Sequence, residues 1–246
     1  MIPWLADNPT LFPDTNTALD EPNGLLAAGG DLSPARLISA YRQGIFPWYS
    51  EDDPILWWSP APRCVLTPQS VHLSRSLRKT LKKHAFTVTF DRAFTQVVAH
   101  CASSGDRAEG TWICEDMCHA YQQLHTLGHA HSVEVWSGED LVGGLYGVAI
   151  NKVFFGESMF STRSNSSKIA LCYLAAQLAA WEFDLIDCQV HNPHLESLGA
   201  VEIDRTEFEH FLAKNADYPA TKTAQWSLEL DNTQVCAFFS PPGNTL

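Results

Sequence analysis

The stretch from residue 131 to residue 200 limits the possible folds most, because its hydrophobic pattern changes period along the chain. Three strand-like segments come first, separated by polar turns, and they are residues 132–136, 141–150 and 153–161. Residues 169–181 form an apolar, alanine-rich run that is too long for a strand and predicts a buried helix. The segment 185–190 predicts one more strand, and a helical turn with Leu195 and Leu198 on its apolar side follows. The predicted order is strand, strand, strand, helix, strand, helix.

A carboxylate and an amide share one face of the last predicted strand. Side chains alternate along a strand, so Asp187 and Gln189 point to one side, while Ile186 and Cys188 point to the core. An Asp-x-Gln triplet alone is most often a solvated strand face, and we favour that interpretation for the triplet by itself. The alternative is that Asp187 and Gln189 belong to a functional site. The surrounding sequence decides between the two interpretations. In the preceding strand, Gly156 predicts a bulge or a close backbone approach.

The N-terminal part of the chain is rich in turn signals and aromatic residues. A strand at 25–28 precedes a helix that Asp31 or Ser33 can cap, with Pro34 in its first turn and Gly44 just beyond its end. An aromatic cluster follows, and it consists of Phe46, Trp48, Tyr49, Trp57 and Trp58.

Most of these aromatic side chains are expected to form the core of a small N-terminal unit. The alternative is a stacking surface for a nucleobase, and Trp48 and Tyr41 are the leading candidates for that role. The segment Ser59-Pro60-Ala61-Pro62 is the best linker candidate. It predicts an N-terminal domain of residues 1–62 and a second domain of residues 63–246.

The chain is acidic, with 28 Asp and Glu residues against 16 Lys and Arg residues and a formal net charge of −12. Such a charge opposes nucleic-acid binding and favours cationic partners, although screening limits its reach to about 10 Å at moderate salt. Residues 74–84 are an exception, because they predict a helix with an apolar stripe, several bases and no acid. These bases are Arg75, Arg78, Lys79, Lys82 and Lys83. A solvated helix face and a phosphate-binding surface are both open interpretations.

The cysteines and histidines indicate neither a disulfide framework nor a metal site. Seven cysteines are an odd number and are scattered, which predicts reduced thiols in a cytoplasmic protein. Cys114 and Cys118, with the histidines near them, fit a zinc pattern only loosely, so we expect no metal. The first residues lack the basic-then-apolar pattern of a signal peptide, and no apolar run approaches the ~20 residues that span a bilayer.

The predicted order of elements resembles the core of the acetyl-coenzyme A N-acyltransferase superfamily. That resemblance implies a glycine-containing loop whose backbone amides bind pyrophosphate at a helix N-terminus. The corresponding residues 161–168 contain no glycine. Coenzyme A is therefore not expected as the acyl donor, and we expect no cofactor.

Motifs spread over almost the whole chain together resemble the leucyl/phenylalanyl-tRNA–protein transferase family. They are EPNGLLAAGGDLSPARL at 21–37, GIFPWY at 44–49, PILWWSP at 54–60, EGTWI at 109–113, HSVEVW at 131–136, LVGGLYGV at 141–148, GESMFS at 156–161 and LIDCQVHNPH at 185–194. The resemblance implies an α+β fold, with a small N-terminal α/β domain and a C-terminal N-acyltransferase-like (GNAT-like) domain.

The same resemblance implies an activity and its partners. Leu, Phe or Met would pass from charged tRNA to the α-amine of a protein that begins with Arg or Lys, which marks that protein for degradation by the N-end rule. Aminoacyl-tRNA and such a protein would be the partners, without a membrane, and the chain would be a monomer.

The resemblance also assigns residues to the site. The catalytic group would be Asp187, Gln189 and Glu157. The aminoacyl-adenosine would be bound by Tyr41, Trp48, Trp112 and Tyr121. The amino-acid side chain would occupy a pocket of Leu145, Phe154, Met159, Leu171, Leu174 and Ile186. The family pattern leads us to expect Met at 145 and Phe at 174, so the two leucines leave the ranking of the donors open.

A mechanism follows as a hypothesis. The donor ester is already activated, and an α-amine with a pKa of about 8 becomes neutral near pH 7 at a cost of only about 1 kcal/mol. Correct placement is worth about 7–11 kcal/mol, so no Ser or Cys nucleophile is required. Gln189 would orient the amine through its side-chain carbonyl, Asp187 would hold the Gln189 amide, and Glu157 would bind the aminoacyl ester end. The basic helix would contact the phosphates of the acceptor stem.

Two other functions compete with this one. A coenzyme A-dependent N-acetyltransferase belongs to the same class of reaction, and the missing glycine loop counts against it. A protein that binds charged tRNA or basic N-termini without catalysis belongs to a different class. Transfer of one residue to a peptide that begins with Arg would separate these possibilities.

Overall fold

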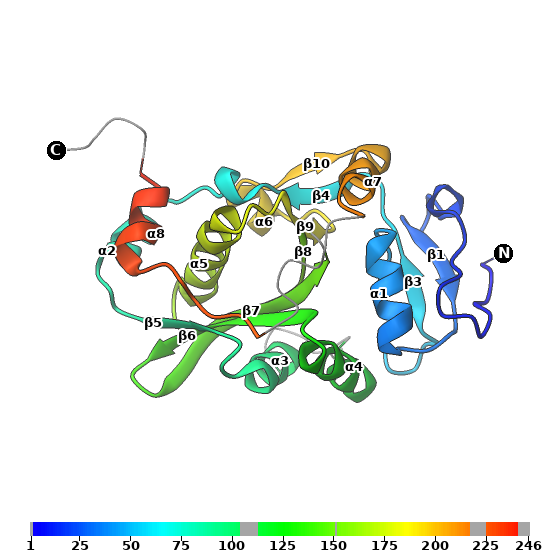
Figure 1. Ribbon diagram of the computed structural model, residues 1–246, viewed down its shortest axis with the longest axis horizontal. Coiled ribbons are helices and arrows are strands. Elements are labelled where there is room, and N and C mark those ends of the chain that lie inside the picture. Colours follow the sequence, from blue (N-terminus) through cyan, green and yellow to red (C-terminus); the bar gives the residue numbers. More distant parts are fainter. Residues whose placement is uncertain (1, 104–112, 151, 217–224, 241–246) are drawn as a thin grey trace.

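The computed structural model describes residues 2–103, 113–150, 152–216 and 225–240, and two β-sheets organise them (Figure 1). The smaller sheet is antiparallel, with the order β1-β3-β2, and its strands are Leu25–Ala28 (β1), Phe46–Pro47 (β2) and Leu56–Trp58 (β3). Helix α1 (Pro34–Arg42) connects β1 to β2, and Ser33 caps it by accepting a hydrogen bond from the Arg36 backbone. The strand and the helix that the sequence predicts here are both confirmed.

The larger sheet, within the described residues, has seven strands in the order β10-β4-β9-β8-β7-β6-β5. They are Arg63–Leu66 (β4), Thr87–Phe90 (β5), Ala130–Ser137 (β6), Asp140–Ile150 (β7), Val153–Ser161 (β8), Leu185–Gln189 (β9) and Val201–Ile203 (β10). Strands β8 and β9 run parallel, because helix α5 (Ser166–Ala180) connects them, and the other described pairs are antiparallel. The predicted order of strands and helix from residue 131 onwards is confirmed.

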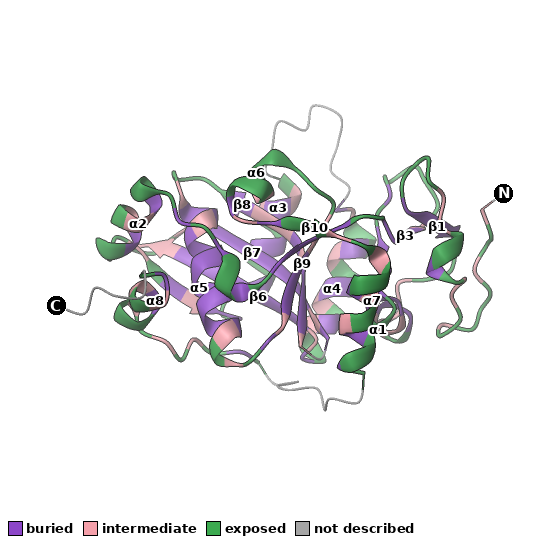
Figure 2. Ribbon diagram, turned by 90° about the horizontal axis from the view of Figure 1, so that it is seen from above, coloured by how far each residue is buried: buried purple, intermediate pink, exposed green. Residues whose placement is uncertain are grey.

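Helices cover both faces of the larger sheet. Helix α5 packs on one face, and α3 (Phe94–Ser103) and α4 (Glu115–Thr126) pack on the other (Figure 1). Almost the whole of α5 is buried, as Figure 2 shows, which agrees with its continuous apolar sequence. The remaining helices are η1 (Thr15–Thr17), η2 (Pro68–Ser70), α2 (Arg75–Lys82), α6 (Pro193–Ser197), α7 (Arg205–Lys214) and α8 (Asn232–Phe238).

The mixed helix and strand architecture agrees with the predicted fold class. Strands β3 and β4 belong to different sheets, so the chain changes sheet at Ser59-Pro60-Ala61-Pro62. One buried apolar cluster nevertheless includes Leu26 and Tyr41 from the N-terminal part and Tyr146 from β7. The domain boundary after residue 62 therefore stays a prediction.

Helix α2 and the cysteine thiols agree with the predictions made from the sequence. In α2, Leu77 and Leu81 are buried, as the apolar stripe predicts, and Ser74 caps the helix. All seven cysteines lie in the described part of the chain and are free thiols. In the ranges that the structure describes, no helix combines the length and apolar character needed to cross a bilayer.

Candidate active site

A β-bulge in β8 creates the polar end of the site. Tyr146 of β7 pairs with Ser158, and Gly147 pairs with Gly156, so Glu157 is an extra residue without a partner across the ladder. A bulge bends its strand and redirects a side chain. The bulge that Gly156 predicts is therefore confirmed.

The parallel pairing of β8 and β9 stops at the bulge. The last paired residues are Phe155 and Asp187, so beyond them the two strands no longer share ladder hydrogen bonds. Glu157 and Gln189 continue their strands into the opening, and a hydrogen bond of 3.1 Å joins their side chains. The sheet itself thus places a carboxylate and an amide at the head of a cavity.

The cavity has a volume of about 220 Å³ and lies between β7, β8, β9 and α5. Its apolar lining includes all the residues predicted for the amino-acid pocket: Leu145, Phe154, Met159, Leu171, Leu174 and Ile186. Gly156, Glu157 and Gln189 also line it. Apolar and polar side chains, the latter also including Ser158, Asn192 and His194, therefore line the same cavity, which is a suitable composition for binding an apolar amino acid with a polar reactive group.

Glu157 is buried and accepts hydrogen bonds from three side chains. The hydroxyl of Tyr41 on α1 donates to Oε1 at 2.8 Å, and the hydroxyl of Tyr121 on α4 donates to Oε2 at 2.6 Å. The two hydroxyls are 2.7 Å apart. The side-chain amide of Gln189 is the third donor. Residues from α1, α4, β8 and β9 are thus held together by one carboxylate.

Burial raises the pKa of Glu157 from 4.5 to about 7. The two tyrosine hydroxyls oppose this shift by stabilising the ionised form, while the nearby Asp187 charge adds to it and Arg63 offsets that effect. A carboxyl group with this pKa changes its protonation state near neutral pH. Perturbed carboxyl groups in a cavity are candidates for functional groups.

Asp187 is fully buried and forms a bidentate ion pair with Arg63 of β4, with Nε–Oδ1 and Nη2–Oδ2 distances of 2.8 and 2.7 Å. Arg63 also donates to the Gly44 carbonyl at 3.0 Å, and its guanidinium group lies over the rings of Phe46 and Phe208. No sequence pattern marked Arg63 as a residue of the site. Its only local signal is a cation at the start of an otherwise apolar strand.

Asp187 contacts Gln189 differently from the prediction. Its Oδ1 accepts a hydrogen bond of 2.9 Å from the backbone N–H of Gln189, whereas the Gln189 side-chain amide binds Glu157. Gln189 has a φ angle of 63°, in the left-handed region. The expectation that Asp187 holds the side-chain amide is corrected: it holds the backbone, and Glu157 holds the amide.

The predicted position of Cys188 also needs correction. Cys64 pairs with Gln189 and Val65 pairs with Asp187, so Cys188 is an extra residue in β9. This second bulge interrupts the alternation of the strand, and Cys188 is half-buried, packs against the apolar core and also lines the cavity. Simple alternation could not predict this, because it assumes a regular ladder.

The residues predicted to bind adenosine lie in different environments. Tyr41 and Tyr121 have no exposed surface, and both hydroxyls bind Glu157, so Tyr41 presents no free face for stacking here and the adenosine-binding role of both tyrosines stays a prediction. Trp48 is 44% exposed and lies 5.4 Å from the ring of Trp58, outside the lining of the cavity. Its role stays a prediction, and Trp112 lies outside the described residues. The core interpretation is correct for Phe46, Tyr49 and Trp57, which are buried.

The bases of the predicted phosphate-binding helix are not equivalent. Arg75, Lys79, Lys82 and Lys83 are exposed. Arg78 is half-buried, and its guanidinium group donates to the backbone carbonyl of Phe239, next to α8. Arg78 is therefore engaged in joining two helices, and four bases remain available for a ligand.

The glycine-free loop before α5 uses its hydroxyl groups internally. Ser166 Oγ lies 2.7 Å from the Val142 carbonyl oxygen and 2.8 Å from that of Arg163. A Cβ atom at Gly143 would collide with this serine, which explains a glycine at that point of β7. The side chain of Ser166 thus occupies the space between α5 and β7.

Comparisons with known proteins give one consistent result. A family model described as leucyl/phenylalanyl-tRNA protein transferase matches residues 65–213, and a model described as its N-terminal domain matches residues 30–61. The leucyl/phenylalanyl-tRNA–protein transferase of Cellvibrio japonicus is 59% identical over 223 residues, which are 89% of this chain and 95% of the relative. That of Saccharophagus degradans is 57% identical over 212 residues, covering 86% and 87%.

The solved structures that align with this chain are less similar to it than these relatives are. L-PGS from Bacillus licheniformis aligns with a TM-score of 0.37 and 11% identity, over 68% of this chain and 53% of that chain. A GCN5-related N-acetyltransferase-like protein from Streptococcus suis aligns with a TM-score of 0.31 and 12% identity, over 70% and 66%.

Proposed function

The chain belongs to the leucyl/phenylalanyl-tRNA–protein transferase family, and we propose that the cavity between β8 and β9 is its aminoacyl site. The reaction of the family is transfer of leucine or phenylalanine from aminoacyl-tRNA to a protein N-terminus. We further propose methionine as a donor, Arg or Lys as the first residue of the acceptor, and N-end rule degradation as the outcome. The reaction would take place in the cytoplasm, where charged tRNA is found.

The observation that supports this proposal most is the meeting of an apolar chamber with the Glu157–Gln189 pair. Leucine, phenylalanine and methionine side chains fit an apolar chamber, and its polar end would then face the aminoacyl ester. The acidic chain also suits a cationic acceptor. Such a pocket separates side chains that differ by one methylene by only about 1–3 kcal/mol, which agrees with a family that accepts more than one donor.

Glu157 supports catalysis by fixing the orientation of Gln189. An ionised carboxylate only accepts hydrogen bonds, so the amide nitrogen of Gln189 faces Glu157 and its carbonyl oxygen points away. Among the described residues, this oxygen has no hydrogen-bond partner. It is available to accept a hydrogen bond from the α-amine of the acceptor protein.

We assign Glu157 a role in binding the aminoacyl group of the charged tRNA. Because its carboxylate cannot donate to an ester oxygen, we assign it to the α-ammonium group of the bound aminoacyl residue instead of the ester. Its Oε1 accepts from two side chains and its Oε2 from one, so Oε2 keeps one free acceptor position.

The chemical step needs placement more than a reactive side chain. The acceptor amine attacks the ester carbonyl, a C–N bond forms, and the C–O bond to the terminal adenosine breaks. The amine releases one proton, and the ribose oxygen takes up one. Placement of amine and ester can supply about 7–11 kcal/mol, and Gln189 would provide it for the amine. Arg63 and Asp187 hold Gln189 by its backbone and are positioning residues.

One assay tests the function directly. The full chain is mixed with leucyl-tRNA and a peptide that begins with Arg, and the expected product is heavier by one leucine residue. Acetyl-coenzyme A in place of the tRNA is expected to give no acetylated peptide. Binding of charged tRNA without any added residue would instead favour a non-catalytic binding protein, and acetylation would favour an acetyltransferase.

The rate of transfer is expected to rise with pH through two ionisations. Below pH 7, the Glu157 carboxyl group is protonated. It can then donate a hydrogen bond itself, so it no longer requires the amide nitrogen of Gln189 to face it. The carbonyl oxygen of Gln189 therefore loses its fixed direction. The acceptor amine loses its proton near pH 8, which adds the second rise. The measurement is kcat/KM from pH 5.5 to 9. In Glu157→Gln, transfer should be slower, and only the rise near pH 8 should remain.

Glu157→Gln is also expected to change how the stability of the folded protein depends on pH. The pKa of Glu157 is higher in the folded protein than the ordinary 4.5, so its stabilising contribution is complete below pH 4.5 and is lost as the pH rises through about 7. Above pH 7 the variant avoids this loss, which amounts to about 3 kcal/mol for a shift of this size. A higher melting temperature than wild type at pH 8, but not at pH 4.5, is expected. If the difference in melting temperature between variant and wild type were the same at both pH values, the raised pKa of Glu157 would be contradicted.

Neutralising the four exposed bases of α2 is expected to weaken tRNA binding and its dependence on salt. Each lost phosphate contact should reduce the slope of log affinity against log salt by about 0.7–0.9. The variant carries Gln at positions 75, 79, 82 and 83 and keeps Arg78, which joins two helices. Affinity is measured between 50 and 300 mM salt.

The matched control neutralises Arg42 on α1 and Lys214 on α7, which are exposed bases on other helices. It should leave the salt slope unchanged. An equal slope for wild type and the α2 variant would remove α2 from the tRNA interface.

A further inference from the structure

Trp226 lies behind the aminoacyl cavity, in the segment that follows the described helix α7 and the family model's last matched residue, 213. We infer that Trp226 determines the depth of the cavity, and hence the preference between leucine and phenylalanine, by supporting Phe154 from behind. This inference rests on the proposed function of the cavity. It assigns a specificity-determining role to a residue that does not line the cavity itself.

The first step is the contact between Trp226 and Phe154. Their ring centroids are 5.9 Å apart, and both side chains are buried. Trp226 also contacts Phe90, Trp181 and Phe183, with centroid distances of 6.4, 5.0 and 5.9 Å. Phe154 is the member of this aromatic cluster that also lines the cavity. It is therefore the link between Trp226 and a bound amino acid.

The second step is that the β7 backbone blocks movement of the Phe154 ring on one side. A Cβ atom on Gly147 would lie 2.6 Å from Phe154 Cζ, so the phenylalanine ring already lies directly against the β7 backbone. Packing of this density transmits a change in one side chain to its neighbours. The indole ring of Trp226 thus limits how far Phe154 can move away from the cavity.

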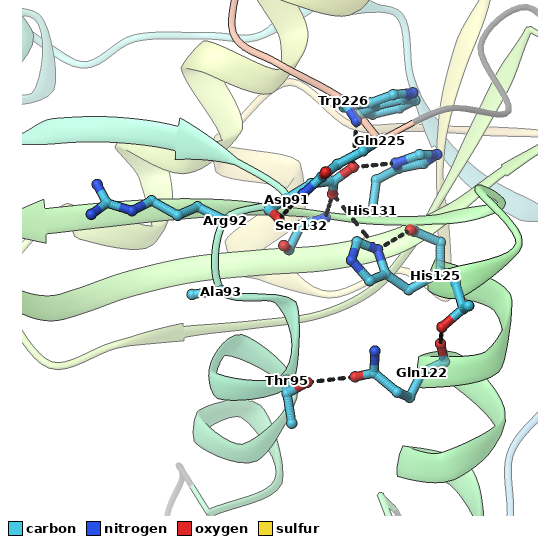
Figure 3. A network of polar contacts seen from close by, with 12 residues as sticks. Asp91, Arg92, Ala93, Thr95, Gln122, His125, His131, Ser132, Gln225 and Trp226 are labelled. Carbon is cyan, nitrogen blue, oxygen red and sulfur yellow. Dashed lines mark hydrogen bonds and ion pairs between the residues drawn. The ribbon is translucent and has the colours of Figure 1, made fainter.

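The third step is that a buried polar network fixes Trp226 (Figure 3). The backbone N–H of Trp226 donates to Asp91 Oδ2 at 2.6 Å, and Gln225 Nε2 donates to the Asp91 carbonyl at 2.9 Å. Asp91 is held in turn by Nδ1 of His131 at 2.7 Å and by the backbone N–H of Ser132 at 2.8 Å. Residues of β6 therefore anchor the segment that carries Trp226.

Stacking fixes the indole ring itself. The ring of Trp226 lies 3.8 Å from that of His131 at an angle of 4°. The indole Nε1 is buried and has no hydrogen-bond partner among the described residues. Because no hydrogen bond of the ring is lost, Trp226→Phe changes mainly the volume behind Phe154, and the backbone bond to Asp91 can remain.

A smaller ring at 226 leaves space into which Phe154 can withdraw, so the cavity becomes deeper. A deeper apolar cavity favours the larger donor side chain, and volume differences of a few methylenes change selectivity by about tenfold or more. Trp226→Phe is therefore expected to raise the ratio of kcat/KM for phenylalanyl-tRNA over leucyl-tRNA about tenfold. The ratio is measured with both donors competing in one mixture, so any loss of folded enzyme affects both equally.

Trp181→Phe is the matched control, because Trp181 belongs to the same cluster through Trp226 and Phe90, whereas Trp226 is the residue whose ring contacts Phe154. It should leave the donor ratio within about twofold of wild type. In a Phe154→Leu background, Trp226→Phe should change the ratio much less than in wild type, because the link is absent. An undiminished effect in that background would overturn the proposed route through Phe154.

The same experiment separates two kinds of failure. Wild type that transfers neither donor would contradict the proposed function. Wild type that transfers both donors, with an unchanged ratio in Trp226→Phe, would reject the role of Trp226 alone.

Discussion

Gln189→Ala is expected to slow transfer about a hundredfold, as misplacement of a reacting group commonly does, while charged-tRNA affinity stays within about twofold. The reason is geometric. The amide nitrogen of Gln189 is bound to Glu157 at 3.1 Å, which turns the carbonyl oxygen away from Glu157. Alanine removes the acceptor for the incoming amine and leaves the apolar chamber intact. Single-turnover transfer and equilibrium binding of the same charged tRNA measure the two effects separately.

A second variant at residue 189 tests the reach of the side chain. Gln189 has a φ angle of 63°, a region that costs glutamine and alanine alike about 1–2 kcal/mol, so Gln189→Ala adds no backbone strain. Asparagine tolerates the left-handed region well and retains an amide, but its side chain is one methylene too short to reach Glu157. Gln189→Asn should therefore be as slow as Gln189→Ala, and exposed Val190→Ala serves as the neighbouring control. Equal losses of binding and transfer would rule out a role in the chemical step.

Arg63→Met is expected to destabilise the protein by about 3–5 kcal/mol, because it leaves the buried Asp187 carboxylate without its counter-ion. Arg63 is 1% exposed and Asp187 has no exposed side chain, so water cannot replace the guanidinium group. The ion pair joins β4 to β9, and Arg63 also binds the Gly44 carbonyl that follows α1. Urea unfolding of wild type and variant gives the difference in the free energy of unfolding.

Replacing both partners separates the energy of the pair from its function. Arg63→Met with Asp187→Leu removes both charges, and such exchanges are often neutral for stability. We expect the double variant to regain most of the lost stability but not the activity, because Asp187 no longer holds the Gln189 backbone. A single variant that unfolds like wild type would mean that the buried pair contributes little.

Elements with a clear local pattern could be predicted from the sequence. The strand-like segments became β6, β7 and β8, and the apolar run at 169–181 became most of α5, because each period matches one regular structure. The apolar pocket and Glu157 were identified through the resemblance to a family, and the cavity contains them all. Gly156 predicted a bulge or a close backbone approach, and the structure has the bulge.

Contacts between distant segments could not be predicted in this way. Arg63 and Asp187 are 124 residues apart in the sequence. The local sequence around each residue gives no sign that it pairs with the other. The bulge at Cys188 has no glycine to mark it, so strict alternation placed Cys188 in the core. Tyr41 and Tyr121 carry no local sign that both hydroxyls would meet on one carboxylate. Packing between elements decides each of these features, and the sequence period describes only one element at a time.

The extra residue in β8 has a consequence for how donor choice can vary within such a fold. Gly156, Glu157, Ser158 and Met159 all line the cavity, which consecutive residues of a regular strand could not do. A deletion or insertion nearby would therefore disturb the carboxylate and the apolar chamber together. Changes of side-chain size at fixed positions, such as the leucines at 145 and 174, avoid this coupling. We expect natural variation in donor preference to accumulate at such positions, while the length of β8 is kept constant.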